Sequence, residues 1–142
     1  MTMILHKTSS GTISFDETTP AIVATFTGFM KSEQFQEFMI IGLDHLKSKL
    51  KTHENVLWLA DTSRHKVQPK ADTDWVASFW TPSAQKAGLT HIAFVLPEDV
   101  FAQVSVNNYK KKATQQGGVT IQMFDQLKTA KDWYTKAMLN EK

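Results

Sequence analysis

The sequence predicts an α/β fold with a mostly parallel sheet, in a single domain over residues 1–142. Short apolar runs alternate with longer segments of helical periodicity, which is typical of repeated strand–helix–strand units. Residues 56–60 form an almost unbroken apolar run that stops at Asp61, as a strand buried on both faces does when it leaves a parallel sheet. The hydrophobic content of 42% and the charged content of 21% indicate a globular chain rather than a disordered one.

The N-terminal part predicts a hairpin followed by a helix. Residues 11–15 and 21–27 alternate between apolar and polar side chains, and a cluster of turn-forming residues separates them. Ser32 then suits the N-cap of an amphipathic helix of about five turns, which carries lysines in its last turns.

The middle of the chain predicts a buried strand, a loop and a helix. The strand covers residues 56–60, and a polar loop over residues 61–70 connects it to a helix that begins near residues 72–73. Pro82 is expected to interrupt or restart this helix, because proline lacks the backbone donor and clashes with the preceding turn. Gly88 fits the position just after the helix end.

The C-terminal part predicts two more strand–helix units. Residues 91–96 read as a buried strand, and Asp99 or Glu98 opens the next helix, which ends at Gly117–Gly118. Residues 119–124 form the last strand, and Asp125 caps the last helix. The expected order is β-β-α-β-α-β-α-β-α with right-handed crossovers. The inner face of the helix after Asp99 is expected to consist of Val100, Phe101, Val104 and Tyr109.

Several function classes lack their sequence signals. The net charge of +2 is too small to indicate a nucleic-acid partner, and the absence of cysteine excludes disulfides and thiolate chemistry. No apolar run reaches the length of a membrane span, so we expect a cytoplasmic protein. The glycine motifs of nucleotide sites are missing and the five histidines are scattered, so we expect no cofactor and no metal site.

Polar residues follow the buried strand at the edge where α/β sheets usually bind ligands. Asp61, Ser63 and His65 are the residue types of a hydrolytic triad, but no nucleophile-elbow motif presents the serine. We expect Asp61 to accept local N–H bonds instead. Alternatively, Arg64 and His65 donate to an anionic ligand or a partner protein. An enzyme would require Asp61, Arg64 and His65 to converge in one concave site.

Two tryptophans extend this set of candidates. Trp75 and Trp80 lie on the short helix after the polar loop. They either pack in the core or line a pocket or a surface that binds a partner. The candidate residues for binding a ligand or a partner are therefore Asp61, Ser63, Arg64, His65, Trp75 and Trp80.

Three segments carry a family resemblance: residues 58–64, residues 74–88, and residues 92–97 together with Phe124 and residues 130–133. With the predicted element order, the chain resembles the SpoIIAA-like, STAS/SEC14-type proteins, in particular small stand-alone bacterial members. The resemblance implies a STAS-like sandwich and a non-enzymatic regulatory or binding module that acts through protein–protein contacts. Its SEC14-like side implies, as an alternative, a carrier or sensor of a small apolar or lipid ligand.

The resemblance also implies regulation by phosphorylation at the helix after the third predicted strand. The Asp-Ser-Ser-Gly type of motif is missing between Asp61 and Val76, so no phosphorylated residue carries over directly. The candidate phosphorylation sites in this region are Ser63 and Thr73, with Ser78 as a further alternative. Exposed aromatic residues and a free sheet edge make a homodimer a further expectation.

Overall fold

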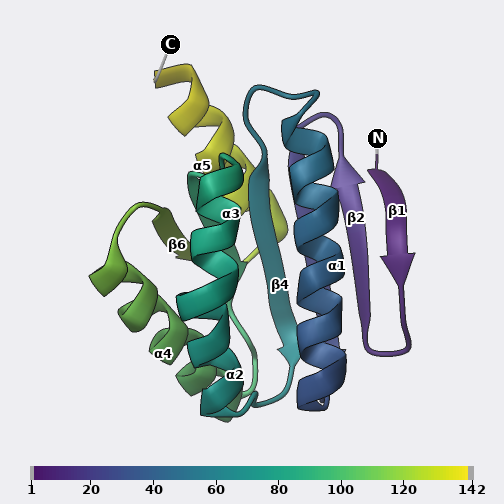
Figure 1. The fold of residues 1–142 in the computed structure, drawn as a ribbon, viewed down its shortest axis with the longest axis vertical. Coiled ribbons are helices and arrows are strands. Elements are labelled where there is room, and N and C mark those ends of the chain that lie inside the picture. Colours follow the sequence, from purple (N-terminus) through teal and green to yellow (C-terminus); the bar gives the residue numbers. More distant parts are fainter. Residues whose placement is uncertain (1, 141–142) are drawn as a thin grey trace.

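The computed structural model describes residues 2–140 as an α/β fold with a six-stranded mixed sheet (Figure 1). The strands are β1 (Thr2–Lys7), β2 (Gly11–Asp16), β3 (Ala21–Gly28), β4 (Leu57–His65), β5 (His91–Val95) and β6 (Thr120–Phe124). The helical segments are α1 (Ser32–Leu50), α2 (Lys70–Trp75), the π-helical turn η1 (Val76–Trp80), α3 (Thr81–Ala87), α4 (Val100–Gln116) and α5 (Leu127–Asn140).

The strands lie in the sheet in the order in which they occur along the chain. β1, β2 and β3 pair antiparallel, whereas β3, β4, β5 and β6 pair parallel. The predicted hairpin and the predicted parallel strands are confirmed. The strand β1 was not predicted, because its side chains are exposed or half-buried at the edge of the sheet and show no alternation.

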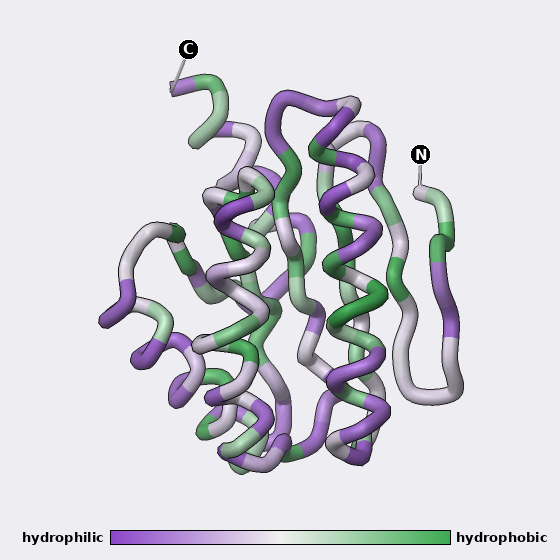
Figure 2. The backbone as a smooth tube through the Cα atoms, in the orientation of Figure 1, coloured by the Kyte–Doolittle hydropathy of each residue, from purple (hydrophilic) through white to green (hydrophobic). Residues whose placement is uncertain are grey.

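Helices cover both faces of the sheet. Figure 1 is viewed from the side of α1 and α3, with β4 visible between them. The main core lies between these helices, α4 and the sheet, and a smaller core lies between α5 and the opposite face. In Figure 2 the hydrophobic colour is prominent along the strands and on parts of α1, whereas the turns are mainly hydrophilic. Within residues 2–140, no helix combines the length and the apolar character that crossing a membrane requires.

A glycine lets α1 approach the sheet closely. A Cβ atom at Gly42 would lie 2.5 Å from the Trp58 ring, which is closer than real side-chain contacts come. The Trp58 ring therefore packs beneath α1 and contacts Trp80, with 4.6 Å between the ring centroids. Both indoles line a cavity in the main core.

The predicted loop after residue 60 is wrong over its first half. β4 continues to His65, since Arg64 and His65 still pair with the end of β3. Their polar character reflects a position at the end of the sheet, where backbone pairing continues after the apolar core has ended.

Of the two outcomes predicted at Pro82, the structure shows a restart of the α-helix and no interruption. The chain stays helical from α2 through η1 into α3, and Pro82 lies in the first turn of α3, where proline is tolerated. Gly88 follows α3 with a φ of 119°, a left-handed conformation that glycine adopts without strain, as predicted. Ser32 is not the N-cap of α1; that position is Lys31, and the Ser32 hydroxyl donates to Asp72 instead.

The predicted inner face of α4 is wrong for three of its four residues. Tyr109 is buried, but the other three are exposed: Val100, Phe101 and Val104. The helix instead turns its small residues to the core, namely Ala102, Ser105, Val106 and Ala113. Because α4 packs close to the sheet and to α2, small side chains on this face permit the approach. The Asp99 N-cap is confirmed, since its side chain accepts from the N–H groups of residues 101 and 102.

Candidate functional site

A cavity of about 60 Å³ lies between strands β3 to β5 and the helices α1, η1 and α4. Its wall is mainly apolar. One water molecule needs on the order of 10–15 Å³, and an apolar cavity of about 150 Å³ binds benzene. The space therefore suits a molecule of a few heavy atoms. The apolar wall includes Phe26, Phe35, Met39, Trp58, Trp80 and Phe94.

A β-bulge places His65 in this cavity. Ala60 and Thr62 line it by the normal alternation of β4, which would also direct Arg64 inward. The pairing of β4 with β3 shifts by one residue after Asp61, because Thr25 pairs with Asp61 and Thr27 with Arg64. An extra residue in one strand reverses the faces of the residues beyond it. His65 is consequently buried against the cavity, and Arg64 is exposed.

Gln68 forms the polar end of the cavity and is held firmly in place. Its backbone N–H donates to the Ser105 hydroxyl over 3.1 Å, and that hydroxyl donates to the Gln68 carbonyl over 3.0 Å. Its side-chain Nε2 donates to the Met30 carbonyl over 3.3 Å and to Asp72 Oδ2 over 2.7 Å. Asp72, itself buried, also accepts from the Ser32 hydroxyl over 2.8 Å. This network joins α1, α2 and α4 around one side chain.

Two buried polar atoms at this end have no hydrogen-bond partner among the described residues: His65 Nδ1 and Gln68 Oε1. Only 5% of His65 and 3% of Gln68 is exposed, so bulk water does not solvate them. A buried polar atom without a partner costs on the order of 1–3 kcal/mol. Such atoms are rare in native structures, and a bound water or ion and a functional role are among the explanations for them.

Burial lowers the pKa of His65, while the neighbouring Gln68 side chain and the Gly28 backbone partly oppose that shift. The imidazole is therefore neutral at pH 7. Its ring also packs against Phe26, with 5.1 Å between the centroids.

The other polar side chains of the cavity wall are satisfied internally. The Tyr109 and Thr81 hydroxyls lie 2.8 Å apart, and burial raises the pKa of Tyr109 far above its ordinary value. The Thr62 hydroxyl donates to the Val95 carbonyl. These groups complete the wall, and the atoms that face the cavity without a hydrogen-bond partner are His65 Nδ1 and Gln68 Oε1.

The structure separates the polar residues that the sequence grouped together. Asp61 accepts from the backbone N–H and the hydroxyl of Ser63, over 3.2 and 2.7 Å. This is the local pairing that we expected of Asp61. Asp61, Arg64 and His65 do not converge: His65 lines the cavity, Arg64 is exposed, and alternation turns Asp61 toward the face covered by α5.

The two candidate tryptophans have different surroundings. Trp80 lines the cavity and its indole N–H donates to the Met39 carbonyl over 2.7 Å. Trp75 is half-buried and stacks on Phe79, with 5.5 Å between the ring centroids. Trp75 belongs to the surface beside the cavity rather than to its wall.

The candidate phosphorylation sites differ in access. The Ser63 hydroxyl is half-buried and bonded to Asp61, as described above. Thr73 is buried, and its hydroxyl donates to the Lys70 carbonyl over 3.0 Å. A kinase would reach Thr73 only after local opening of α2.

Sequence reasoning missed Gln68, Asp72 and Ser105 as residues of the site. They come from a loop and two helices, and nothing in their spacing indicates that they meet. The position of Asp72 near a predicted helix start is visible in the sequence, but its contact with the Gln68 amide is not.

A second hollow, of about 230 Å³, lies between the β1–β2 turn and α1. It is larger but more polar, and its side chains bond locally: the Thr8 hydroxyl with Ser10 and Gly11, and Gln34 with the Lys31 N–H. None of the buried, unpaired polar atoms identified within residues 2–140 lines it. The smaller cavity is the better candidate site.

Comparisons with protein families, with curated proteins and with solved structures give no match. The geometry of the cavity is therefore the guide to function. Across the part of the chain that the structure describes, no group of three histidine, aspartate or glutamate side chains could hold a metal ion.

Proposed function

We propose that this protein is a non-catalytic binding module whose cavity takes a small, mainly apolar molecule. One observation carries the proposal: an apolar cavity contains two buried polar atoms without partners. The lining side chains come from β3, β4, β5, α1, α2, η1, α4 and the loop that holds Gln68, so an occupant would contact much of the main core at once. Such an occupant would stabilise the folded state through mass action.

The size of the cavity favours a small molecule over a membrane lipid as the ligand. A volume of about 60 Å³ has no room for a long acyl chain. The proposed role is therefore a sensor or carrier of a small molecule rather than of a membrane lipid. The π-helical turn η1 supports a functional role for this wall, since such turns frequently occur at functional sites.

The element order and the helices on the main face support the further proposal that the chain is a small stand-alone STAS-type domain. In this view it is a regulatory module of the cytoplasm. Sensing a small molecule would replace the phosphorylation that the resemblance implies, because the expected serine motif is missing.

NMR titration of the ¹⁵N-labelled protein with 1-chlorobutane tests the cavity function. We expect the indole N–H signals of Trp58 and Trp80 to shift. Ala60→Leu fills the cavity and should abolish the shifts. Ala93→Leu is the matched control, because Ala93 is equally small and buried but packs on the α5 face. Equal shifts in both variants, or none in the unmodified protein, would contradict the proposal.

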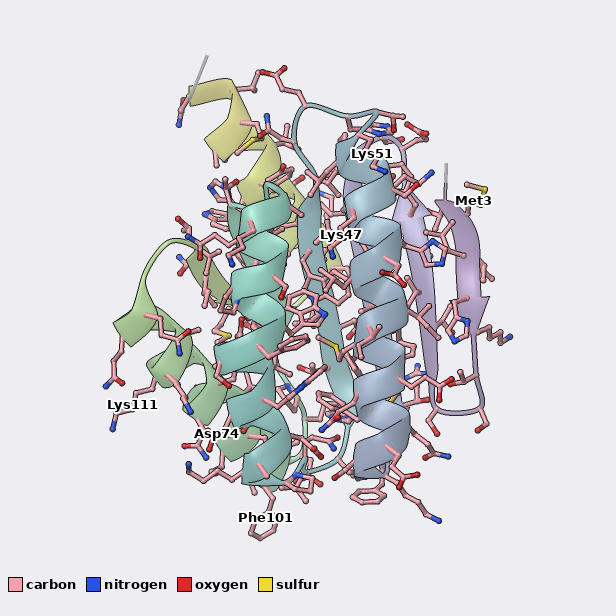
Figure 3. The ribbon with its side chains drawn as sticks, viewed as in Figure 1. Met3, Lys47, Lys51, Asp74, Phe101 and Lys111 are labelled. Atoms are coloured by element: carbon pink, nitrogen blue, oxygen red, sulfur yellow. The ribbon has the colours of Figure 1, made fainter. Side chains whose placement is uncertain are left out.

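A second candidate function is docking of a protein at the carboxyl ends of the parallel strands. Five large apolar side chains are exposed there and form what we call the carboxyl-edge patch: Phe29, Val67, Val100, Phe101 and Val104. Hydrogen bonds from Lys66 to Gly28 and from Gln68 to Ser105 bring their loops together. Figure 3 shows Phe101 projecting from the end of the molecule. Exposed apolar clusters of this kind often mark interaction sites.

Site-specific photo-crosslinking in the native cell tests this second function. A photoreactive phenylalanine analogue replaces Phe101 or, as a control, Phe79, which is also exposed but lies outside the patch. A discrete adduct from position 101 that is missing from position 79 would support docking. Identical patterns from both positions would contradict it.

A further inference from the structure

The orientation of the Gln68 amide determines what a ligand must offer. Both groups near Nε2 are acceptors, the Met30 carbonyl and the Asp72 carboxylate. The reversed amide would place its oxygen against these two oxygens, so the NH₂ group must occupy this position. The atom without a close hydrogen bond is consequently the acceptor Oε1, which a donor from a ligand or from the nearby His65 ring would complete.

His65 adds a second, adaptable group. A neutral imidazole presents Nδ1 either as a donor or as an acceptor, depending on the tautomer. A hydroxyl group can donate to one partner and accept from another, so it can satisfy both Gln68 Oε1 and His65 Nδ1. An amide N–H can satisfy Gln68 Oε1 in the same way.

The surroundings of this polar end disfavour a negative charge. No lysine or arginine lines the cavity, and the buried Asp72 carboxylate lies directly behind Gln68. A carboxylate in the cavity would lose its hydration and would face the carbonyl oxygen of Gln68. A wholly apolar molecule would leave the two buried atoms unsatisfied.

We infer that the cavity selects uncharged small molecules that carry a hydroxyl or N–H donor next to an apolar part, with the donor directed at Gln68 Oε1. This inference rests on the proposed cavity function and specifies its ligand class. Short-chain alcohols and primary amides have this chemistry, whereas fatty acids, organic phosphates and hydrocarbons do not.

Three probes of matched size test the inference: butan-1-ol, 1-chlorobutane and butyrate. NMR titration of the unmodified protein measures a Kd for each from the Trp58 and Trp80 signals. One net hydrogen bond contributes about 0.5–1.5 kcal/mol, so butan-1-ol should bind about 2- to 10-fold more tightly than 1-chlorobutane. Butyrate should show no cavity binding.

A variant then assigns the preference to one residue. Gln68→Met keeps the length of the side chain and removes the acceptor, so butan-1-ol should lose its advantage over 1-chlorobutane. Gln103→Met is the matched control, because the Gln103 amide donates to the Pro97 carbonyl over 2.8 Å and does not line the cavity. This control should keep the preference.

The possible outcomes separate the two proposals. Equal affinity for butan-1-ol and 1-chlorobutane, or tight binding of butyrate, overturns the inference and leaves the cavity function intact. Binding of none of the three probes overturns both. The comparison of probes on the unmodified protein decides the inference even if Gln68→Met fails to fold.

Discussion

The two faces of the sheet are built on different principles. The face under α5 is a small apolar core in which Leu57 and Leu59 meet the side chains of the last helix. The face under α1, η1 and α4 is larger and contains a cavity with buried polar groups at one end. Both faces use residues of the same three central strands. One sheet thus supports a closed apolar core on one side and a cavity with buried polar groups on the other.

The alternation of β4 and β5 makes this division possible. Ala60 and Ala93 are small, buried residues of neighbouring strands, yet Ala60 faces the cavity and Ala93 faces α5. Enlarging either residue adds the same volume to a different environment. Substitutions at these two positions therefore test directly whether the two faces differ in packing.

The largest expected effect is a difference in stability between two leucine variants. Ala93→Leu overpacks the α5 face and should lower the free energy of unfolding by about 1–3 kcal/mol. Ala60→Leu has the cavity to fill and should lower it by less than about 1 kcal/mol. Urea denaturation followed by tryptophan fluorescence measures both. If Ala60→Leu proves the more costly variant, the cavity is not available space.

An ion pair between Lys131 of α5 and Asp16 at the end of β2 links the helix to the sheet, and we call this ion pair the tether. Burial raises the pKa of Asp16, but the Lys131 ammonium at 2.8 Å and the N–H groups of Thr18 and Thr19 outweigh it, so the pKa is lowered overall. The folded carboxylate thus contributes stability above the unfolded pKa of about 3.9 and loses it as the pH falls through the lower folded value.

Asp16→Asn tests this tether. It should lower the free energy of unfolding at pH 7 by about 1 kcal/mol, because the ion pair is partly exposed and screened by water. The difference from the unmodified protein should shrink as the pH falls below about 4. Denaturation curves at pH 7 and at acidic pH check both parts. An unchanged difference across this range would contradict the role of the carboxylate.

The cavity face should respond to acid in a higher pH range. Burial lowers the pKa of His65 in the folded protein, so the unfolded chain takes up a proton first as the pH falls below about 6.5. The folded state therefore loses stability from that pH downward. His65→Gln should remove this contribution between pH 7 and 5, leaving a flatter profile. A profile identical to that of the unmodified protein would contradict a buried neutral imidazole.

The smallest expected effect concerns the surface of α4. Phe101 is 70% exposed, so Phe101→Ser should change the free energy of unfolding by less than about 0.5 kcal/mol. Thermal unfolding of the two proteins side by side measures it. A large loss would mean that Phe101 packs in the folded molecule and is not part of an exposed patch.

Local patterns identified most of the fold but not the site. The hairpin, the buried strands and the caps at Asp99 and Gly88 follow from alternation, apolar runs and turn chemistry, which depend on near neighbours. The face of α4 did not follow, because its small residues pack inward and its larger apolar residues lie beyond the sheet. The strand β1 did not follow either, since an exposed edge strand carries little patterning.

Two of the six residues predicted for a binding site line the cavity, and four do not. The sequence pointed to the carboxyl end of the strand through residue 60, and His65 and Trp80 from that region do line the cavity. Asp61 does not, because normal alternation turns it to the other face of the sheet, and Arg64 does not, because the bulge after Asp61 reverses the faces of the residues that follow. A bulge depends on pairing with β3, which sequence spacing does not reveal.

By itself, the sequence determined the α/β class, the buried parallel strands and the lack of thiol chemistry. These properties follow from composition and short-range periodicity. The meeting of His65 and Gln68 at the end of an apolar cavity follows from the tertiary fold alone. The reason is physical: the partners that orient Gln68, Met30, Asp72 and Ser105, come from separate segments that only folding brings together.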